Sequence, residues 1–134
     1  MRLWHEELLN KLPRQQLIGQ HRELCALRGN GYEQNHSTVN YVWEYNKERL
    51  IAFHLKVMKE MENRGYNPSP EWYNLKYRGK NCDNWNDVDE RKVYYYQKNK
   101  CYPEHNDKYL RECVDNLFEK NCICRFLEGV GINE

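Results

Sequence analysis

Residues 13–28 read PRQQLIGQHRELCALR and predict the helix on which the rest of the fold depends. Proline is tolerated in the first turn of a helix, and a glycine directly after the last turn, here Gly29, is a common stop signal. Apolar or long side chains recur on one face at three- and four-residue spacing: Leu17, His21, Leu24, Cys25 and the stem of Arg28, with Ile18 at the margin. We expect this face to pack against a core and the opposite face to stay polar.

Two further segments have the helical period. One runs from about Lys47 to Arg64 and stops before Gly65; its expected buried face consists of Leu50, Phe53, His54, Val57, Met58 and Met61. The other begins near Asn106 or Asp107, either of which is a good N-cap, and its stripe is Leu110, Cys113, Val114, Leu117 and Phe118. A shorter helix is expected over residues 37–45, where Ser37 or Thr38 would be the cap.

Residues 66–105 lack a long period and contain three of the four prolines and most of the tyrosines. Because aromatic side chains need burial or a partner, we predict an ordered aromatic loop and not a flexible linker. The simplest architecture is all-α, with three main helices around one core and a long loop wrapped over them. A length of 134 residues favours a single domain over residues 1–134.

Composition leaves the function open but indicates the compartment. Charged residues make up 31% of the chain and the formal net charge is +1, which neither requires nor excludes a polyanionic partner. The first 28 residues are more basic than the remainder. No apolar stretch has the length of a membrane span, and the start MRLWHEELL does not resemble a signal peptide. We therefore expect a cytoplasmic protein with no membrane partner and with its six cysteines reduced.

The polar face of the first helix carries the candidate site. At 100° per residue, Glu23 lies opposite Cys25, with Gln16, Gly19 and Gln20 on its own side. Gly19 costs the helix about 1 kcal/mol relative to alanine, and a spot without a side chain would let backbone or a ligand approach Glu23. Arg14 and Arg22 flank this face and would suit phosphates. The alternative is a solvated surface on which Glu23 pairs with a nearby Lys or Arg.

The segment Gln15 to Leu24 resembles the first helix of the phage pyrimidine-dimer DNA glycosylases of the endonuclease V type. A Gln, a Leu and the triplet Arg22-Glu23-Leu24 occur there at matching spacing close behind the N-terminus. The aromatic run from His36 to Tyr45, the helix end EMENRGY and the segment Tyr102-Pro103-Glu104-His105 are similar to later sections of that family. The start MRLW resembles a bacterial branch, whereas residues 68–100 match poorly.

This resemblance implies a base-excision repair enzyme acting on damaged double-stranded DNA, a glycosylase that is also an abasic-site lyase and hence an endonuclease. The α-amine of Met1 would attack the sugar and form a Schiff base, Glu23 would be the essential carboxylate, and Arg22 would organise the site. Candidate DNA contacts are Arg2, Arg14, Gln15, Gln16 and Arg28. The resemblance implies no metal and no organic cofactor, and the sequence indicates no obligate protein partner.

Several positions depart from the phage pattern. Arg2 is too bulky for removal of the initiator methionine, so we expect Met1 to be retained and to supply the nucleophile. Ala26 stands where the family has an arginine, for which Arg28 would compensate, and Gln16 stands where it has a histidine. These changes leave the lesion open. The alternatives are a lyase for another lesion or for abasic sites only, and a non-catalytic helical module that binds nucleic acid.

Other clusters have simpler interpretations. A zinc site would draw on Cys101, His105, Cys113, Cys122 and Cys124, but no pair has C-x₂-C spacing, and buried free thiols are favoured. His21 and His54 fall on apolar faces, where core histidines are the usual finding. A further aromatic and basic cluster, similar in composition to a nucleic-acid stacking surface, is assigned to packing beneath the loop: Trp72, Tyr73, Tyr77 and Arg78.

Overall fold

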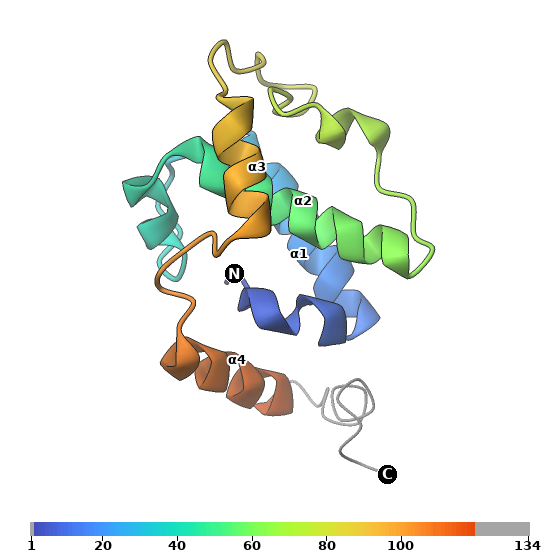
Figure 1. Cartoon of the computed structure of the whole chain (residues 1–134), viewed down its shortest axis with the longest axis vertical. Helices are drawn as coiled ribbons and strands as arrows, with labels where there is room; N and C mark the ends of the chain where they lie inside the picture. Colours follow the sequence, from blue (N-terminus) through green and yellow to red (C-terminus); the bar gives the residue numbers. More distant parts are fainter. Residues whose placement is uncertain (1, 120–134) are drawn as a thin grey trace.

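The computed structural model describes residues 2–119, and every regular element among them is helical. Four α-helices and three 3₁₀ helices follow one another along the chain (Figure 1): η1 (Glu6–Lys11), α1 (Arg14–Arg28), η2 (Asn40–Glu44), α2 (Lys47–Asn63), η3 (Pro70–Tyr73), α3 (Glu90–Lys98) and α4 (Asp107–Glu119). The predicted all-α class is therefore confirmed. None of the helices within residues 2–119 is long and apolar enough to cross a membrane.

The three predicted main helices are present at the expected places. After Arg28, the Gly29 N–H bonds the carbonyls of Cys25 and Ala26 and closes α1. The side chain of Asn46 caps α2 by accepting from the Arg49 N–H, and Gly65 follows the helix with φ +85°. Such a positive φ is a conformation that glycine adopts without strain. At α4, the Asn106 side chain accepts from the Tyr109 N–H, which confirms the predicted cap.

Two expectations about local structure need correction. The predicted loop over residues 66–105 contains α3, which is capped by the Asp89 side chain and packs against α2. The sequence of α3 shows no clear helical period, because Val93 is its one fully buried apolar residue and the neighbouring residues are tyrosines and charged side chains. The helix expected over residues 37–45 is a 3₁₀ helix of five residues, η2, and its N-cap is Val39, with no side-chain cap.

Helix α2 lies at the centre of the molecule, with α1 behind it and α3 across it in the view of Figure 1. Its predicted stripe is buried, and so are Ile51, Ala52 and Leu55 on its flanks. A helix that is apolar over most of its circumference must be covered on more than one side. The partners on those sides are α1, α3 and η1.

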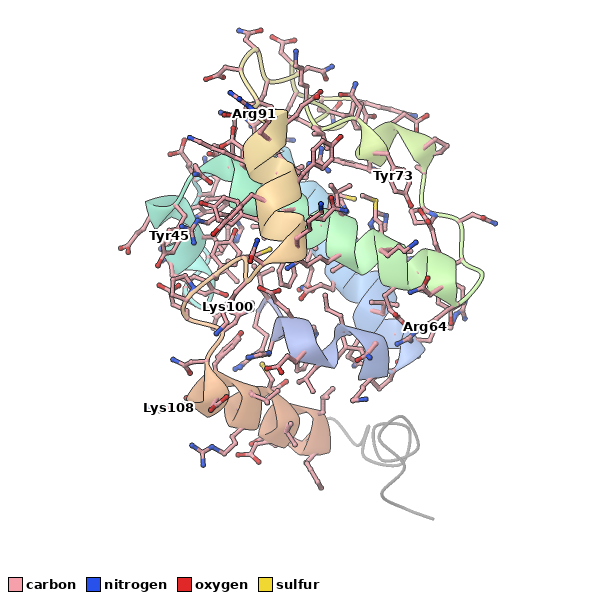
Figure 2. All side chains as sticks on the ribbon, viewed as in Figure 1. Tyr45, Arg64, Tyr73, Arg91, Lys100 and Lys108 are labelled. Carbon is pink, nitrogen blue, oxygen red and sulfur yellow. The ribbon has the colours of Figure 1, made fainter. Side chains whose placement is uncertain are left out.

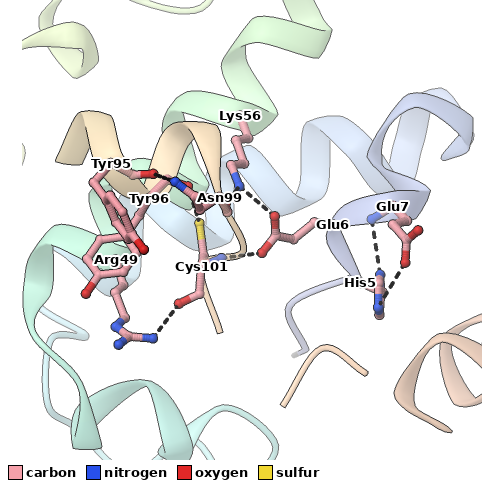
Figure 3. Close-up of polar contacts among 9 residues, drawn as sticks. All are labelled: His5, Glu6, Glu7, Arg49, Lys56, Tyr95, Tyr96, Asn99 and Cys101. Atoms are coloured by element: carbon pink, nitrogen blue, oxygen red, sulfur yellow. Dashed lines mark hydrogen bonds and ion pairs between the residues drawn. The ribbon is translucent and has the colours of Figure 1, made fainter. Parts of the chain in front are cut away.

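Glu6 anchors the first 3₁₀ helix to the centre of the fold (Figure 3). One carboxylate oxygen lies 2.6 Å from the Lys56 Nζ on α2, and the other accepts from the Cys101 N–H at 2.5 Å. Arg64, at the end of α2 (Figure 2), donates to the Leu12 carbonyl at 2.7 Å and to the Leu9 carbonyl at 3.3 Å. Both ends of η1 are therefore tied to α2, which positions the residues that precede Glu6.

The side chain of Arg28 is fully buried and joins α1 to α2 and to the loop after η3. One terminal nitrogen donates to the His54 Nδ1 at 3.0 Å and to the Trp72 carbonyl at 3.0 Å. The other donates to the carbonyls of Asn74 and Tyr77, at 3.0 Å and 2.9 Å. The proposed DNA contact of Arg28 is thus wrong, because its donors are occupied inside the protein; its place on the buried stripe is confirmed.

The aromatic cluster of the loop packs around this guanidinium. Trp72 lies against Arg28 with its ring centroid 5.1 Å from Cζ, and its ring meets Tyr77 edge-on at 4.8 Å. Arg78 donates back to the carbonyls of Arg28 and Gly29. These contacts confirm the packing interpretation for Trp72, Tyr77 and Arg78, whereas Tyr73 remains exposed.

Two buried histidines, His54 and His105, and the half-buried His21 have lowered pKa values. Arginine can only donate, so the His54 Nδ1 accepts from Arg28 and its Nε2 carries the proton, which is donated to the His21 Nδ1 at 2.8 Å. Burial, with the charge of Arg28, lowers the pKa of His54 well below its ordinary value and lowers that of His21. Burial also lowers the pKa of His105 to about 3. The core assignment is confirmed for His54, whereas His21 is half-buried and hydrogen-bonded to it.

Replacing Arg28 with methionine should destabilise the protein by about 3 kcal/mol or more, because the His54 nitrogen and three loop carbonyls would lose their buried donor. Urea unfolding followed by tryptophan fluorescence measures this change. Arg22→Met, an exposed position on the same helix, is the control and should change stability by no more than about 0.5 kcal/mol. Equal effects of the two substitutions would contradict the role assigned to Arg28.

Stability should fall as the pH drops from 7.5 to 5. In the unfolded chain His21, His54 and His105 would take up protons near their ordinary pKa of 6.5, whereas in the folded protein burial lowers the pKa of each, so the folded state binds fewer protons over this range. Each extra proton bound by the unfolded state lowers the free energy of unfolding by roughly 1.4 kcal/mol per pH unit below that value. Urea unfolding at several pH values tests this, and His105→Phe should make the slope shallower. A free energy of unfolding that is flat over this range would rule the explanation out.

Candidate active site

The start of the described chain lies beside α1 and is held by the side chain of Gln20, which is fully buried. The Gln20 Oε1 accepts from the Trp4 N–H at 2.6 Å, and its Nε2 donates to the Arg2 carbonyl at 3.0 Å. The same Nε2 lies 3.2 Å from the Glu23 Oε1, so it also donates to the carboxylate. One carboxamide therefore connects the N-terminal backbone to the candidate catalytic residue.

Helix α4 holds the same segment from another direction. The Tyr109 hydroxyl donates to the Leu3 carbonyl, and the Arg2 guanidinium lies over the Tyr109 ring, 5.9 Å from its centroid. Side chains from two helices thus bind three backbone groups of residues 2–4, namely the Arg2 and Leu3 carbonyls and the Trp4 N–H. This arrangement replaces the partner strand that an extended segment would otherwise need.

A cavity of about 510 Å³ opens beside this segment. Its lining comes from the N-terminal segment, the first three turns of α1, the loop before η2, and α4: Arg2, Trp4, Gln15, Gln16, Gly19, Arg22, Glu23, Thr38 and Asn116. Five of the predicted site residues are among them, namely Arg2, Gln15, Gln16, Arg22 and Glu23. The structure therefore brings most of the candidate residues to one place.

Two predicted site residues lie elsewhere, and a third, Met1, is not among the described residues. Arg14 is exposed, its guanidinium lies 5.4 Å from the centroid of the Tyr66 ring, and it does not line the cavity. Arg28 is buried, as described above. Met1, the predicted nucleophile, lies outside the described residues, and its α-amine therefore stays a prediction.

The charges around the cavity favour an anionic ligand. Arg2 and Arg22 supply two guanidinium groups and Glu23 one carboxylate, so the charged lining has a net positive sign. Guanidinium groups suit phosphate oxygens because they donate two parallel hydrogen bonds. A cavity volume of about 510 Å³ is in the range of pockets that bind small molecules. The cavity is therefore large enough to hold more than a single group of a ligand.

Gly19 faces the cavity with open space in front of it. A Cβ built on Gly19 would meet no described atom within 4 Å. The missing side chain predicts a close approach of backbone or a ligand at this position; in the structure the open space of the cavity lies there, between Gln15–Gln16 and Glu23.

Sequence reasoning missed part of this site. Trp4 and Thr38 were not singled out, and Gln20 was noted only as a neighbour of Glu23 on the helix. Asn116 comes from α4, far along the chain from Glu23, and no local pattern marks it. Only a pairing of α4 with the N-terminal segment, which is a tertiary contact, brings Asn116 to the cavity.

The zinc set considered from the sequence falls only partly within the described residues. Cys101 and Cys113 are buried free thiols, as predicted, while Cys122 and Cys124 lie outside the described residues. A different trio has its ligand atoms within 4.8 Å of one another: His21, Cys25 and His54. The His54 Nε2, however, carries the proton donated to His21, since Arg28 occupies the other ring nitrogen. Burial also raises the pKa of Cys25 to about 11, so neither group is ready to bind a cation.

The family model described as pyrimidine dimer DNA glycosylase matches residues 1–74. This range covers α1, with Glu23 and Arg22, and ends just after η3. Helices α3 and α4 follow the matched range. Comparison with curated proteins and with solved structures finds no match.

Two substitutions at Gly19 should separate helix stability from access to the cavity. Gly19→Ala and Gly19→Leu both raise helix propensity and should stabilise α1, by up to about 1 kcal/mol for alanine. Only leucine extends far into the cavity, so only Gly19→Leu should weaken binding of a DNA duplex, measured by fluorescence anisotropy. Unchanged affinity in Gly19→Leu, with the fold intact, would show that DNA does not enter this cavity.

Proposed function

The chain belongs to the pyrimidine dimer DNA glycosylase family, and from this premise we propose that the cavity beside α1 is the active site of a DNA glycosylase with abasic-site lyase activity. The observation that carries the proposal is the convergence of Glu23, Arg22 and the first described residues of the chain on one cavity. A nucleophile at the chain's start and a helix carboxylate are the two groups that this chemistry requires.

In the proposed reaction the unprotonated α-amine of Met1 attacks C1′ of the damaged nucleotide. A carbon–nitrogen bond forms, the bond from C1′ to the base breaks, and the base leaves with the electron pair and takes up a proton. Opening of the sugar gives a Schiff base. Loss of a proton from C2′ then breaks the bond between C3′ and its oxygen, which cuts the strand by β-elimination.

The chemistry of the two groups suits these steps. A free α-amine ordinarily has a pKa near 8, roughly 7.7–8.0, so a useful fraction is unprotonated at neutral pH, unlike a typical lysine. An unprotonated amine is the nucleophile that Schiff-base formation needs. The Glu23 carboxylate stabilises positive charge developing at the sugar and then carries the proton for elimination.

The contacts of the N-terminal segment support this assignment. Gln20 binds the Arg2 carbonyl and the Glu23 carboxylate through one nitrogen, at 3.0 Å and 3.2 Å. Met1 is covalently joined to Arg2, and consecutive Cα atoms are about 3.8 Å apart, so a residue bonded to Arg2 has only a short distance to span. Arg2 and Arg22 would bind the phosphates on either side of the damaged nucleotide, with Gln15 and Gln16 as further DNA contacts.

The preferred substrate we propose is a pyrimidine dimer in double-stranded DNA. A second candidate, a lyase for abasic sites or another lesion, is favoured by one observation. Arg28, expected to compensate for the arginine that Ala26 replaces, is buried and bonded to loop carbonyls. Ala26 itself is exposed and has no charge. The proposed enzyme thus has one arginine fewer with which to bind the duplex next to the lesion. This loss matters most for a substrate that must be strongly distorted.

Borohydride should trap a covalent complex between the protein and a duplex that contains an abasic site, because it reduces the Schiff base. Glu23→Gln should lower the rate of strand cleavage by on the order of 100-fold or more, and an N-terminal extension that blocks the Met1 amine should abolish trapping. Glu112→Gln, an exposed carboxylate on α4, and a C-terminal extension are the matched controls and should be without effect. Full activity with the amine blocked would reject the mechanism.

The same assay distinguishes the two substrates. A duplex with a single thymine dimer and a duplex with a single abasic site, identical in the surrounding sequence, are compared at equal enzyme concentration. Cleavage of both supports the glycosylase; cleavage of the abasic duplex alone supports the second candidate. Binding without trapping of either duplex would indicate a non-catalytic module.

A further inference from the structure

We infer that Gln20 is a positioning residue of the active site: its buried carboxamide holds the N-terminal segment at the cavity and keeps the Glu23 carboxylate in its ionised form. The inference rests on the proposed function, since it concerns how the amine and the carboxylate meet. Among the described residues, the Gln20 side chain forms hydrogen bonds only with the N-terminal segment and with Glu23.

The orientation of the Gln20 amide follows from its partners. The Trp4 N–H is a donor, so it must face the Gln20 oxygen; the Arg2 carbonyl and the Glu23 carboxylate are acceptors, so they must face the nitrogen. The reversed amide would place an oxygen against two acceptors and an N–H₂ group against a donor. Because the side chain is fully buried, no solvent relieves such a mismatch, and one orientation is strongly favoured.

This orientation has a structural consequence. A carboxamide that accepts from residue 4 and donates to residue 2 pairs with the backbone as a neighbouring strand would. It therefore sets the path of the residues that lead to the proposed amine. Since α1 carries both Gln20 and Glu23 three residues apart, the segment is placed in register with the carboxylate by a rigid helix turn.

The same orientation has an electrostatic consequence. The second hydrogen on the Gln20 Nε2 is donated to the Glu23 Oε1, and a hydrogen bond donated to a carboxylate favours its charged form. In the proposed reaction the charged form is the one that stabilises positive charge at the sugar and takes the C2′ proton. Gln20 would thus act on the chemistry through Glu23 without touching the substrate, as its complete burial requires.

Tyr109 provides a matched comparison. Its hydroxyl holds the Leu3 carbonyl of the same segment from α4. Loss of this bond loosens the segment. It leaves intact the hydrogen bond that Gln20 donates to Glu23. Gln20→Met, which has a similar length and no polar atom that can donate, removes both functions at once. A change seen in Gln20→Met and absent from Tyr109→Phe therefore reports on the carboxylate.

The experiment uses the full chain and a duplex with one abasic site, and measures single-turnover cleavage and borohydride trapping between pH 5 and 9. In Gln20→Met we expect the saturating rate to fall on the order of 10-fold, with the half-saturating DNA concentration changed less than about 3-fold, because no contact with DNA is lost. On the acid side the rate falls first as the amine is protonated, near its ordinary pKa of about 8, and falls again as Glu23 is protonated, ordinarily near about pH 4. This second, carboxylate limb is the acid limb that should move to higher pH, into the measured range. Tyr109→Phe should lower the rate without moving that limb. Thermal unfolding shows whether each variant is folded at the assay temperature.

A second variant covers the case in which Gln20→Met does not fold. Gln20→Glu keeps the acceptor for the Trp4 N–H, and its carboxyl can donate only when it is protonated. Its rate relative to the wild type should therefore fall as the pH rises. An unmoved acid limb in Gln20→Met, or a pH-independent ratio in Gln20→Glu, would overturn the inference while trapping by the wild type upholds the proposed function. Absence of trapping by the wild type would overturn both.

Discussion

The buried carboxamide of Gln20 is the interaction on which the candidate site depends. It joins the backbone of residues 2–4 to the Glu23 carboxylate, which lies on the same helix as Gln20. An extended segment near a chain terminus is not held in one position by its own backbone, because water forms equally good hydrogen bonds with its N–H and C=O groups. Enclosing its N–H and C=O groups with complementary side chains makes the ordered position the favourable one.

Arg28 has the equivalent role on the far side of α1. Its guanidinium is fully buried, and burial lowers its pKa to about 10, so it stays charged at neutral pH. A buried charge is tolerated only with several acceptors, here supplied by His54 and three loop carbonyls. The loop after η3 is thereby bound to the helix that carries the site. The contacts of Arg28 on the opposite face of α1 thus help to hold this helix in place at the cavity.

The site extends beyond the part of the chain that the family model matches. Residues 1–74 contain Glu23, Arg22 and Gln20, but Asn116 and Tyr109 reach the cavity and the N-terminal segment from α4. A helix outside the matched range thus contributes to the lining of the candidate site and to the hold on the N-terminal segment.

The sequence by itself determined the all-helical class, the bounds of α1 and α2, the start of α4 and the polar face with Glu23, Arg22, Gln15 and Gln16, because periodicity and caps are local signals. It did not determine α3, in which Val93 is the one fully buried apolar residue, or the position of Arg28, whose long side chain suits a surface as well as a core. Only the tertiary structure decided that Gln20 binds residues 2–4 and that Asn116 lines the cavity. Contacts of this kind join residues far apart in the chain, and they depend on how helices pack, which no local pattern encodes.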